Sequence, residues 1–143
     1  MSNQNKNLNK ISCIFCKIIN NELPSLKIYE DKTVLAFLDI NPINIGHTLV
    51  VPKKHFRNIY DLPEEITTHV TKIAKKISIA FKKIGTDGTN ISINNEKAAG
   101  QIIFHFHIHV IPRFIKDNLS PWPAKKPKEG ELKKVAKKII SAL

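Results

Sequence analysis

The sequence predicts a single α+β domain whose sheet is mostly antiparallel. The chain has 143 residues, near the usual size of one domain, and 42% of them are apolar. Several short strand-like segments surround one long helix with few crossovers between them, which is typical of an α+β fold. No internal repeat and no low-complexity block divides the chain, so one folded unit is expected.

The first half of the chain contains short strands separated by turns. Residues 1–10 are polar and are expected to form a loose tail. Two strand-like segments on either side of a turn precede a loop and a third, buried strand: Lys27–Glu30, Thr33–Leu38 and His47–Val51. This order predicts neighbouring strands that pair along one sheet.

The clearest element is a long amphipathic helix over about Leu62–Ile84. Apolar residues recur in it at spacings of three and four, with the lysines largely outside that stripe: Ile66, Val70, Ile73, Ile77, Phe81 and Ile84. Asp61 is expected to cap its N-terminus, and Gly85 to end it. Because apolar residues spread around Ile73–Ile84, this helix is also expected to bury one side against a second copy of the chain.

Two further strand-like segments and a second helix follow the long helix. We expect strands at Thr89–Asn94 and from Gln101 to about Pro112, and a helix at Glu129–Leu143. The last helix is amphipathic, and its lysines gather on one side. It is expected to dock on the domain with the lysines in solvent, although such a helix could also bind a membrane surface or a partner.

The charge and composition exclude several classes of protein. The net charge is +11, but residues 121–143 carry seven lysines and two glutamates, whereas the central hundred residues carry only +3. A polynucleotide partner is therefore not favoured, because it would need a basic stripe on the body of the domain. No apolar run could span a bilayer, no signal peptide is visible, and two cysteines make no disulfide scaffold. A cytoplasmic protein is expected.

The most informative stretch holds three histidines at alternate positions: His105, His107 and His109. On a strand they share one face, and the apolar residues beside them point into a core: Phe104, Phe106, Ile108 and Val110. Imidazoles gathered on one face need partners, which disfavours a purely structural role. They could share a metal ion, or one could act as nucleophile or acid–base while its neighbours fix its tautomer and bind an anion.

A pair of cysteines lies near the start of the chain. Cys13 and Cys16 have the two-residue spacing that lets both thiolates reach one tetrahedral metal ion. The pair supplies only two of the four ligands such an ion needs. From the residues alone, a redox pair or two buried small side chains therefore remain alternatives to a metal site.

Three blocks of the sequence resemble the histidine-triad (HIT) family in order and spacing. They are Cys13–Ser25, Tyr29–His55 and Gly100–Arg113, and the last contains the family signature His-φ-His-φ-His-φ-φ as HFHIHVIPR. The resemblance is nearest to Hint-type and small bacterial members. It implies a HIT-like fold and a homodimer, with a HIT domain over residues 11–114 and a C-terminal extension over 115–143 that bears the basic helix.

The resemblance implies a hydrolase or nucleotidyl transferase that cleaves a nucleoside 5′-phosphoramidate or related nucleotide conjugate at the α-phosphate. His107 holds the position of the family nucleophile, which forms a nucleotidyl-histidine intermediate. His109 matches the histidine near the phosphate or leaving group, and His47 matches an upstream histidine that supports the nucleophile. Hydrolysis of dinucleoside polyphosphates is an alternative activity. A nucleotide-binding sensor with little catalysis is an alternative from another class, and a metalloenzyme with its ion on the triad is a third.

Other residues match positions that bind the nucleotide in the family, and a purine nucleotide is the implied ligand. Asp39 matches the acid that holds the ribose hydroxyls, and Asn94 and Gln101 match residues near the phosphates. An apolar slot for the base is implied by six residues: Ile14, Phe15, Ile18, Phe37, Ile40 and Leu49. Ile102 departs from the pattern, because the family often has a hydroxyl residue there that helps at the leaving group.

The resemblance also bears on the cysteines. Bacterial members with the same Cys-x-x-Cys motif complete a metal site with the histidine of Pro-Lys-x-His and with the first histidine of the triad. Those positions here are His55 and His105, so the resemblance implies a zinc ion held by Cys13, Cys16, His55 and His105. With four protein ligands the ion would have no open position for substrate, so the implied role is structural.

Overall fold

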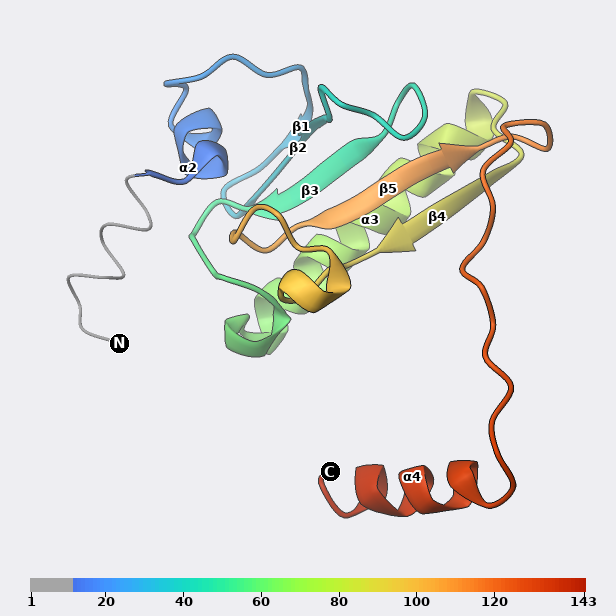
Figure 1. Cartoon of the computed structure of the whole chain (residues 1–143). Coiled ribbons are helices and arrows are strands. Elements are labelled where there is room, and N and C mark those ends of the chain that lie inside the picture. The colour runs from blue at the N-terminus through green and yellow to red at the C-terminus, as the bar shows by residue number, and fades with distance from the viewer. Residues whose placement is uncertain (1–11) are drawn as a thin grey trace.

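The structure is a computed structural model, and it describes residues 12–143. The expected tail at residues 1–10 lies outside the described residues. A five-stranded sheet forms the centre, and one long helix lies across it (Figure 1). The helices and strands have these bounds: α2 Ile14–Ile19, β1 Lys27–Glu30, β2 Val34–Leu38, β3 Thr48–Pro52, η1 Ile59–Asp61, α3 Glu64–Lys83, β4 Gly88–Ser92, η2 Lys97–Ala99, β5 Ile108–Arg113 and α4 Glu131–Ile140.

The sheet has the strand order β1-β2-β3-β5-β4, and every neighbouring pair is antiparallel. The predicted α+β class with an antiparallel sheet is therefore confirmed. Because β5 lies between β3 and β4, His109 is paired with Leu49 on one side and with Ser92 on the other. This register places His109 beside the start of β3, which His47 immediately precedes.

Both faces of the sheet are covered at its centre. Side chains alternate along a strand, so β2 sends Val34 and Ala36 into the core beneath α3, and Leu35 and Phe37 into a second core beside α2. The apolar stripe of α3 packs into the first core. The core stripe of α3 is therefore covered within one chain, whereas Ile79 and Ile84 remain exposed, and the expected contact of the helix with a second copy stays a prediction.

The start of α3 differs from the prediction. Asp61 does not cap it: Pro63 precedes the helix, and no side-chain hydrogen bond caps its N-terminus. The carboxylate of Asp61 instead accepts hydrogen bonds from the backbone N–H groups of Arg57 and Asn58, both at 3.1 Å. Asn58 and Asp61 thus form a capping box around the short helix η1, one turn earlier in the chain.

The strand predicted from Gln101 begins only at Ile108, so of the three histidines only His109 lies in a strand. The preceding segment bonds to other parts of the chain. The N–H of Phe106 donates to the carbonyl of Phe56 at 2.7 Å, and the Gln101 side chain binds the carbonyl of Ile103 at 3.1 Å. Phe104 does not enter the core as expected.

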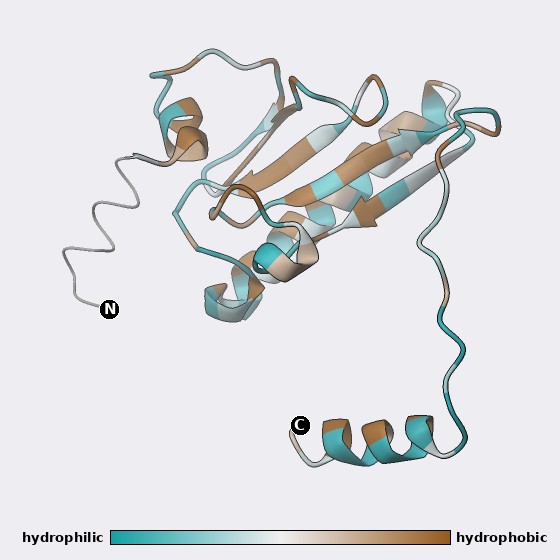
Figure 2. Ribbon diagram, viewed as in Figure 1, coloured by the Kyte–Doolittle hydropathy of each residue, from teal (hydrophilic) through white to brown (hydrophobic). Residues whose placement is uncertain are grey.

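The C-terminal helix α4 does not dock on the domain, which contradicts the prediction. None of its residues is buried, and it stands apart at the end of an extended segment (Figure 1). Apolar residues lie along one side of it and lysines along the other (Figure 2). Pro121, Pro123 and Pro127 explain the extended segment, because proline cannot continue a helix. Among the described residues, no helix is long and apolar enough to cross a membrane.

Candidate functional site

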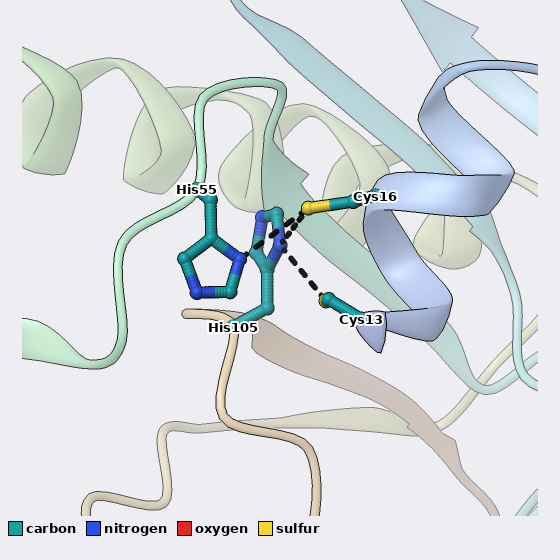
Figure 3. A group of neighbouring side chains, drawn as sticks. All are labelled: Cys13, Cys16, His55 and His105. Carbon is teal, nitrogen blue, oxygen red and sulfur yellow. Dashed lines mark hydrogen bonds between the residues drawn. The ribbon is translucent and has the colours of Figure 1, made fainter. Parts of the chain in front are cut away.

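The four residues of the implied metal site come together from three parts of the chain. Cys13 precedes α2 and Cys16 lies in it, His55 follows β3, and His105 precedes β5 (Figure 3). Their four ligand atoms all lie within 4.8 Å of one another. The Sγ of Cys16 is 3.3 Å from Nδ1 of His55 and 3.6 Å from Nδ1 of His105, and the Sγ of Cys13 is 3.5 Å from Nδ1 of His105.

These distances fit a tetrahedral zinc ion. Zinc–sulfur and zinc–nitrogen bonds of the usual lengths place the sulfur and nitrogen ligands about 3.6 Å apart. The Nε2–H of His105 donates to the carbonyl of Pro52 at 2.8 Å, which leaves the lone pair on Nδ1 facing the two thiols. Burial lowers the pKa of His105 to about 4, so that its ring is neutral at pH 7, as a metal ligand must be.

His107 lies next to this cluster and is buried. Its Nδ1–H donates to the carbonyl of His105 at 2.7 Å, which assigns the proton to Nδ1 and leaves the lone pair on Nε2. The ring of Phe15 packs edge-on against the imidazole, with 5.3 Å between the ring centroids. Burial lowers the pKa of His107, so the imidazole is neutral near pH 7. A neutral imidazole with a free Nε2 lone pair is a nucleophile.

His47 and His109 are hydrogen-bonded to each other, and each carries its proton on Nε2, whereas His107 carries its proton on Nδ1. The backbone N–H of Ile43 donates to Nδ1 of His47 at 3.2 Å, so the proton of a neutral His47 is on Nε2. That Nε2 lies 2.9 Å from Nδ1 of His109, to which it donates. The proton of His109 is therefore on its own Nε2, an atom that is buried and has no hydrogen-bond partner. His47 thus supports His109, rather than His107 as we expected.

The neighbouring imidazoles of His107 and His109 therefore differ in which ring nitrogen carries the proton. The centroids of the His107 and His109 rings are 4.7 Å apart, and one ring offers a lone pair while the other offers an N–H. Burial and the neighbouring His107 and His47 lower the pKa of His109 to about 4. The pair stays uncharged at pH 7, and it can attack an electrophile while donating a hydrogen bond to an anion beside it.

Asp39 lies at the end of β2, beside His47. One oxygen accepts a hydrogen bond from the N–H of Asn41 at 2.9 Å, and the other is 3.7 Å from Nδ1 of His47. Asp39, His47 and His109 bring three possible metal-binding atoms together. However, the 2.9 Å between the two ring nitrogens is a hydrogen bond and is shorter than the roughly 3.3 Å expected for two nitrogens on one tetrahedral ion.

Among the described residues, the three histidines of the triad do not form one metal-binding group. His105 belongs to the cluster with the cysteines, His109 belongs to the group with Asp39, and His107 belongs to neither. The arrangement therefore disfavours the metalloenzyme with an ion bound by all three histidines.

Four of the six residues implied to form the apolar slot for the base pack together, and two do not. Phe15, Ile18, Phe37 and Leu49 pack together in the core beside α2. Ile40 is 86% exposed on the loop after Asp39, and Ile14 is exposed on α2. We call the four buried residues the apolar floor; the two exposed residues lie outside it.

The residues implied near the phosphates lie in the loop between β4 and β5. The Nδ2 of Asn94 is 3.5 Å from the carbonyl of Gly100. The side-chain NH₂ of Gln101 donates to the carbonyls of Arg57 and Ile103, at 2.7 and 3.1 Å, so both of its N–H donors are used within the chain. Ile102 is 83% exposed.

Sequence analysis missed the backbone groups that set the proton positions. The carbonyls of Pro52 and His105 and the N–H of Ile43 decide which nitrogen of each histidine carries the proton. It also missed Glu96 and Arg57, which pair across two loops at 3.1 Å. Backbone groups leave no signature in a sequence, and neither residue lies in a motif.

Comparison with known proteins identifies one family. Residues 20–116 match the HIT domain family. An uncharacterized HIT-like protein of Borreliella burgdorferi is 54% identical over 108 residues, covering 73% of this chain and 78% of that protein. An adenosine 5′-monophosphoramidase of Saccharomyces cerevisiae is 40% identical over 136 residues, covering 92% of this chain and 83% of that protein.

Solved structures share the fold. A HIT family protein from Bacillus anthracis superposes with a TM-score of 0.82 at 39% identity, covering 92% of this chain and 97% of that one. A zinc-bound histidine triad family protein from Mycobacterium smegmatis has a TM-score of 0.75 at 38% identity, covering 94% of this chain and 99% of that one.

Proposed function

Because this chain belongs to the histidine-triad (HIT) family, we propose that it hydrolyses a nucleoside 5′-phosphoramidate or a related nucleotide conjugate through a nucleotidyl-His107 intermediate. The observation that carries this proposal is the pair of adjacent neutral imidazoles with opposite proton positions. A nucleophilic imidazole alone would also be compatible with a protein that binds a nucleotide without cleaving it. The buried, unpartnered Nε2–H of His109 next to it supports a reaction centre that receives an anion.

In the proposed reaction the Nε2 lone pair of His107 attacks the α-phosphorus. The phosphoramidate nitrogen, protonated from solvent, leaves as a neutral amine when its bond to phosphorus breaks. The Nδ1–H bond to the His105 carbonyl strengthens as the ring becomes cationic, which stabilises the intermediate. The His109 N–H donates to a phosphate oxygen throughout. Water then attacks the phosphorus, and His107 regains its lone pair.

The nucleotide itself is proposed to lie over the apolar floor, with a purine as its base. Asp39 would accept hydrogen bonds from the ribose hydroxyls with its second oxygen, which is not committed to the Asn41 backbone. Asn94 would face the phosphates, because its one hydrogen bond, to Gly100, is long at 3.5 Å. We do not assign Gln101 a phosphate contact, since both of its N–H donors are used.

Two named relatives support the choice of substrate class. The yeast relative is named an adenosine 5′-monophosphoramidase, and a relative from Arabidopsis thaliana, 41% identical over 134 residues, is named an adenylylsulfatase. Both names are those of enzymes that act on an adenosine phosphate conjugate. We therefore place dinucleoside polyphosphates second as substrates.

A zinc ion on Cys13, Cys16, His55 and His105 is the second part of the proposal. The donor set fits the ion, and its role would be to tie α2 to the segment that carries His107. Cys16→Ser is expected to lose the metal and to lower the melting temperature. Elemental analysis of protein prepared without chelators measures the first effect, and a metal content near zero in the wild type would contradict the proposal.

We also propose that the chain forms a homodimer and that residues 11–114 form its catalytic domain. Strand β4 lies at an edge of the sheet with Ile91 exposed, which leaves backbone groups for a partner. Sedimentation at micromolar concentration tests the dimer, and a mass of one chain, 16.2 kDa, would refute it. A cytoplasmic location remains a prediction.

The activity is tested by a panel of substrates. Adenosine and guanosine 5′-phosphoramidates and diadenosine polyphosphates are offered to the wild type and to His107→Ala. We expect the phosphoramidates to turn over fastest and His107→Ala to lose that turnover. Equal rates for the two proteins would exclude the proposed chemistry, and nucleotide binding without any turnover would favour the sensor.

A further inference from the structure

The segment that carries the proposed nucleophile is not itself a strand of the sheet. Strand β5 begins at Ile108, and residues 103–107 pair with no strand. Their anchors are the last residue of β3 and the irregular segment that follows it. His105 donates to the carbonyl of Pro52, and the N–H of Phe106 donates to the carbonyl of Phe56. The position of His107 therefore depends on where residues 52–57 lie.

A closed ring of hydrogen bonds joins residues 52–57 to the loop before the triad. The carboxylate of Glu96 accepts from Nη2 of Arg57 at 3.1 Å. The carbonyl of Arg57 accepts from the side-chain NH₂ of Gln101 at 2.7 Å, and the side-chain oxygen of Gln101 accepts from the backbone N–H of Glu96 at 2.9 Å. Three residues thus bond one another in a circle, and Gln101 also holds the carbonyl of Ile103.

Glu96 is the central member of this ring. Its carboxylate also accepts from the Nδ2 of the buried Asn58 at 2.7 Å, and the Arg57 guanidinium that it holds lies 4.2 Å from the centroid of the Phe104 ring. Its backbone has φ of 69°, a left-handed conformation that a residue with a side chain seldom adopts. Such a conformation persists only where surrounding contacts enforce it, and it is common beside reaction centres.

We propose that Glu96, acting through Arg57 and Gln101, is a positioning residue for His107. It fixes the loop at residues 94–104 against residues 52–57, and so fixes the carbonyl of His105 that orients the imidazole. This inference rests on the proposed function. The Glu96 side chain is 46% exposed, so its ion pair contributes little to stability, whereas misplacing a nucleophile slows a reaction strongly.

The test compares Glu96→Ala and Glu96→Gln with Glu30→Ala in the full chain. Glu30 is the control for loss of an exposed, ion-paired carboxylate: its side chain is 39% exposed on β1 and pairs with the side chains of Lys27 and Lys53, but it does not belong to the ring of Glu96, Arg57 and Gln101. With adenosine 5′-phosphoramidate we expect Glu96→Ala to lower kcat about tenfold with little change in KM. Glu96→Gln keeps one acceptor oxygen, so its kcat should fall between those of Glu96→Ala and the wild type. The kcat and melting temperature of Glu30→Ala should stay near those of the wild type, whereas the melting temperature of Glu96→Ala should fall by a few degrees, because the buried Asn58 amide loses an acceptor.

A second readout does not depend on turnover. The Nδ1–H of His107, held by the His105 carbonyl, gives an imidazole proton signal in NMR spectra. We expect this signal to exchange faster with water in Glu96→Ala and to be unchanged in Glu30→Ala. If the wild type lacks activity but the signal responds in this way, the proposed function fails while the positioning role stands.

Three results would overturn the positioning role. The first is an unchanged His107 signal in Glu96→Ala, and the second is a kcat equal to that of Glu30→Ala. The third is a lower kcat that comes with a melting temperature lowered by many degrees in both Glu96 variants. That result would show that Glu96 serves the stability of the whole domain.

Discussion

Replacing Phe15 by alanine tests how α2 and the reaction centre depend on each other. The Phe15 ring is buried in the core beside α2, 5.5 Å from the ring of Phe37 and 5.3 Å from that of His107. Removing a buried phenylalanine ring costs about 3–5 kcal/mol. Because α2 has only six residues and an exposed outer side, it can partly collapse into the space. We therefore expect a loss of about 3 kcal/mol, or about 10 °C in melting temperature.

The assay is urea unfolding of Phe15→Ala beside Ile14→Ala. Ile14 is the adjacent residue on the same helix, but it is 40% exposed, so its truncation should cost less than about 1 kcal/mol. Burial is the main cause of the lowered pKa of His107. Opening the site should therefore move that pKa up toward its ordinary value, which NMR titration measures. A cost below 1 kcal/mol for Phe15→Ala, or an unmoved pKa, would refute the packing described here.

Two further predictions concern His109 and α4. The pKa of His109 is about 4 in the folded chain, so the unfolded chain binds more protons between about pH 6.5 and 4, and the free energy of unfolding should fall as the pH falls through this window. His109→Gln should make that fall shallower in urea titrations, and an unchanged slope would contradict the assigned pKa. Ile139 is 56% exposed on α4, so Ile139→Asp should change the free energy of unfolding by less than about 0.5 kcal/mol. A larger loss would show that something covers the helix in solution.

The regular elements followed from local patterns in the sequence. The short apolar runs and turn residues around β1, β2 and β3, and the spacing of apolar residues in α3, predict elements that the structure has within a few residues. The helix buries one face and β2 and β3 bury both, and the order of residues records each pattern directly. The same reasoning grouped Cys13, Cys16, His55 and His105 only with the help of the family resemblance.

The predictions failed where side chains compete with the backbone. Asp61 caps η1 instead of α3, because its carboxylate accepts hydrogen bonds from the backbone N–H groups of Arg57 and Asn58. The strand through the triad is cut short: the Gln101 side chain binds the carbonyl of Ile103, and the N–H of Phe106 donates to the carbonyl of Phe56, so this segment bonds to groups outside the sheet ladder. Alternation alone cannot show such competition. The proton positions on His107 and His109 also required coordinates, since backbone groups distant in sequence set them.

Trapping of the covalent intermediate tests directly whether His107 is the nucleophile. Wild-type protein is mixed with adenosine 5′-phosphoramidate, denatured within milliseconds without acid, digested and analysed by mass spectrometry. We expect an adenylyl group on the peptide that contains His107, attached to that residue and absent from His107→Ala. An active wild type that carries no adduct at any time, or one that carries it on His109, would contradict the assignment of the nucleophile.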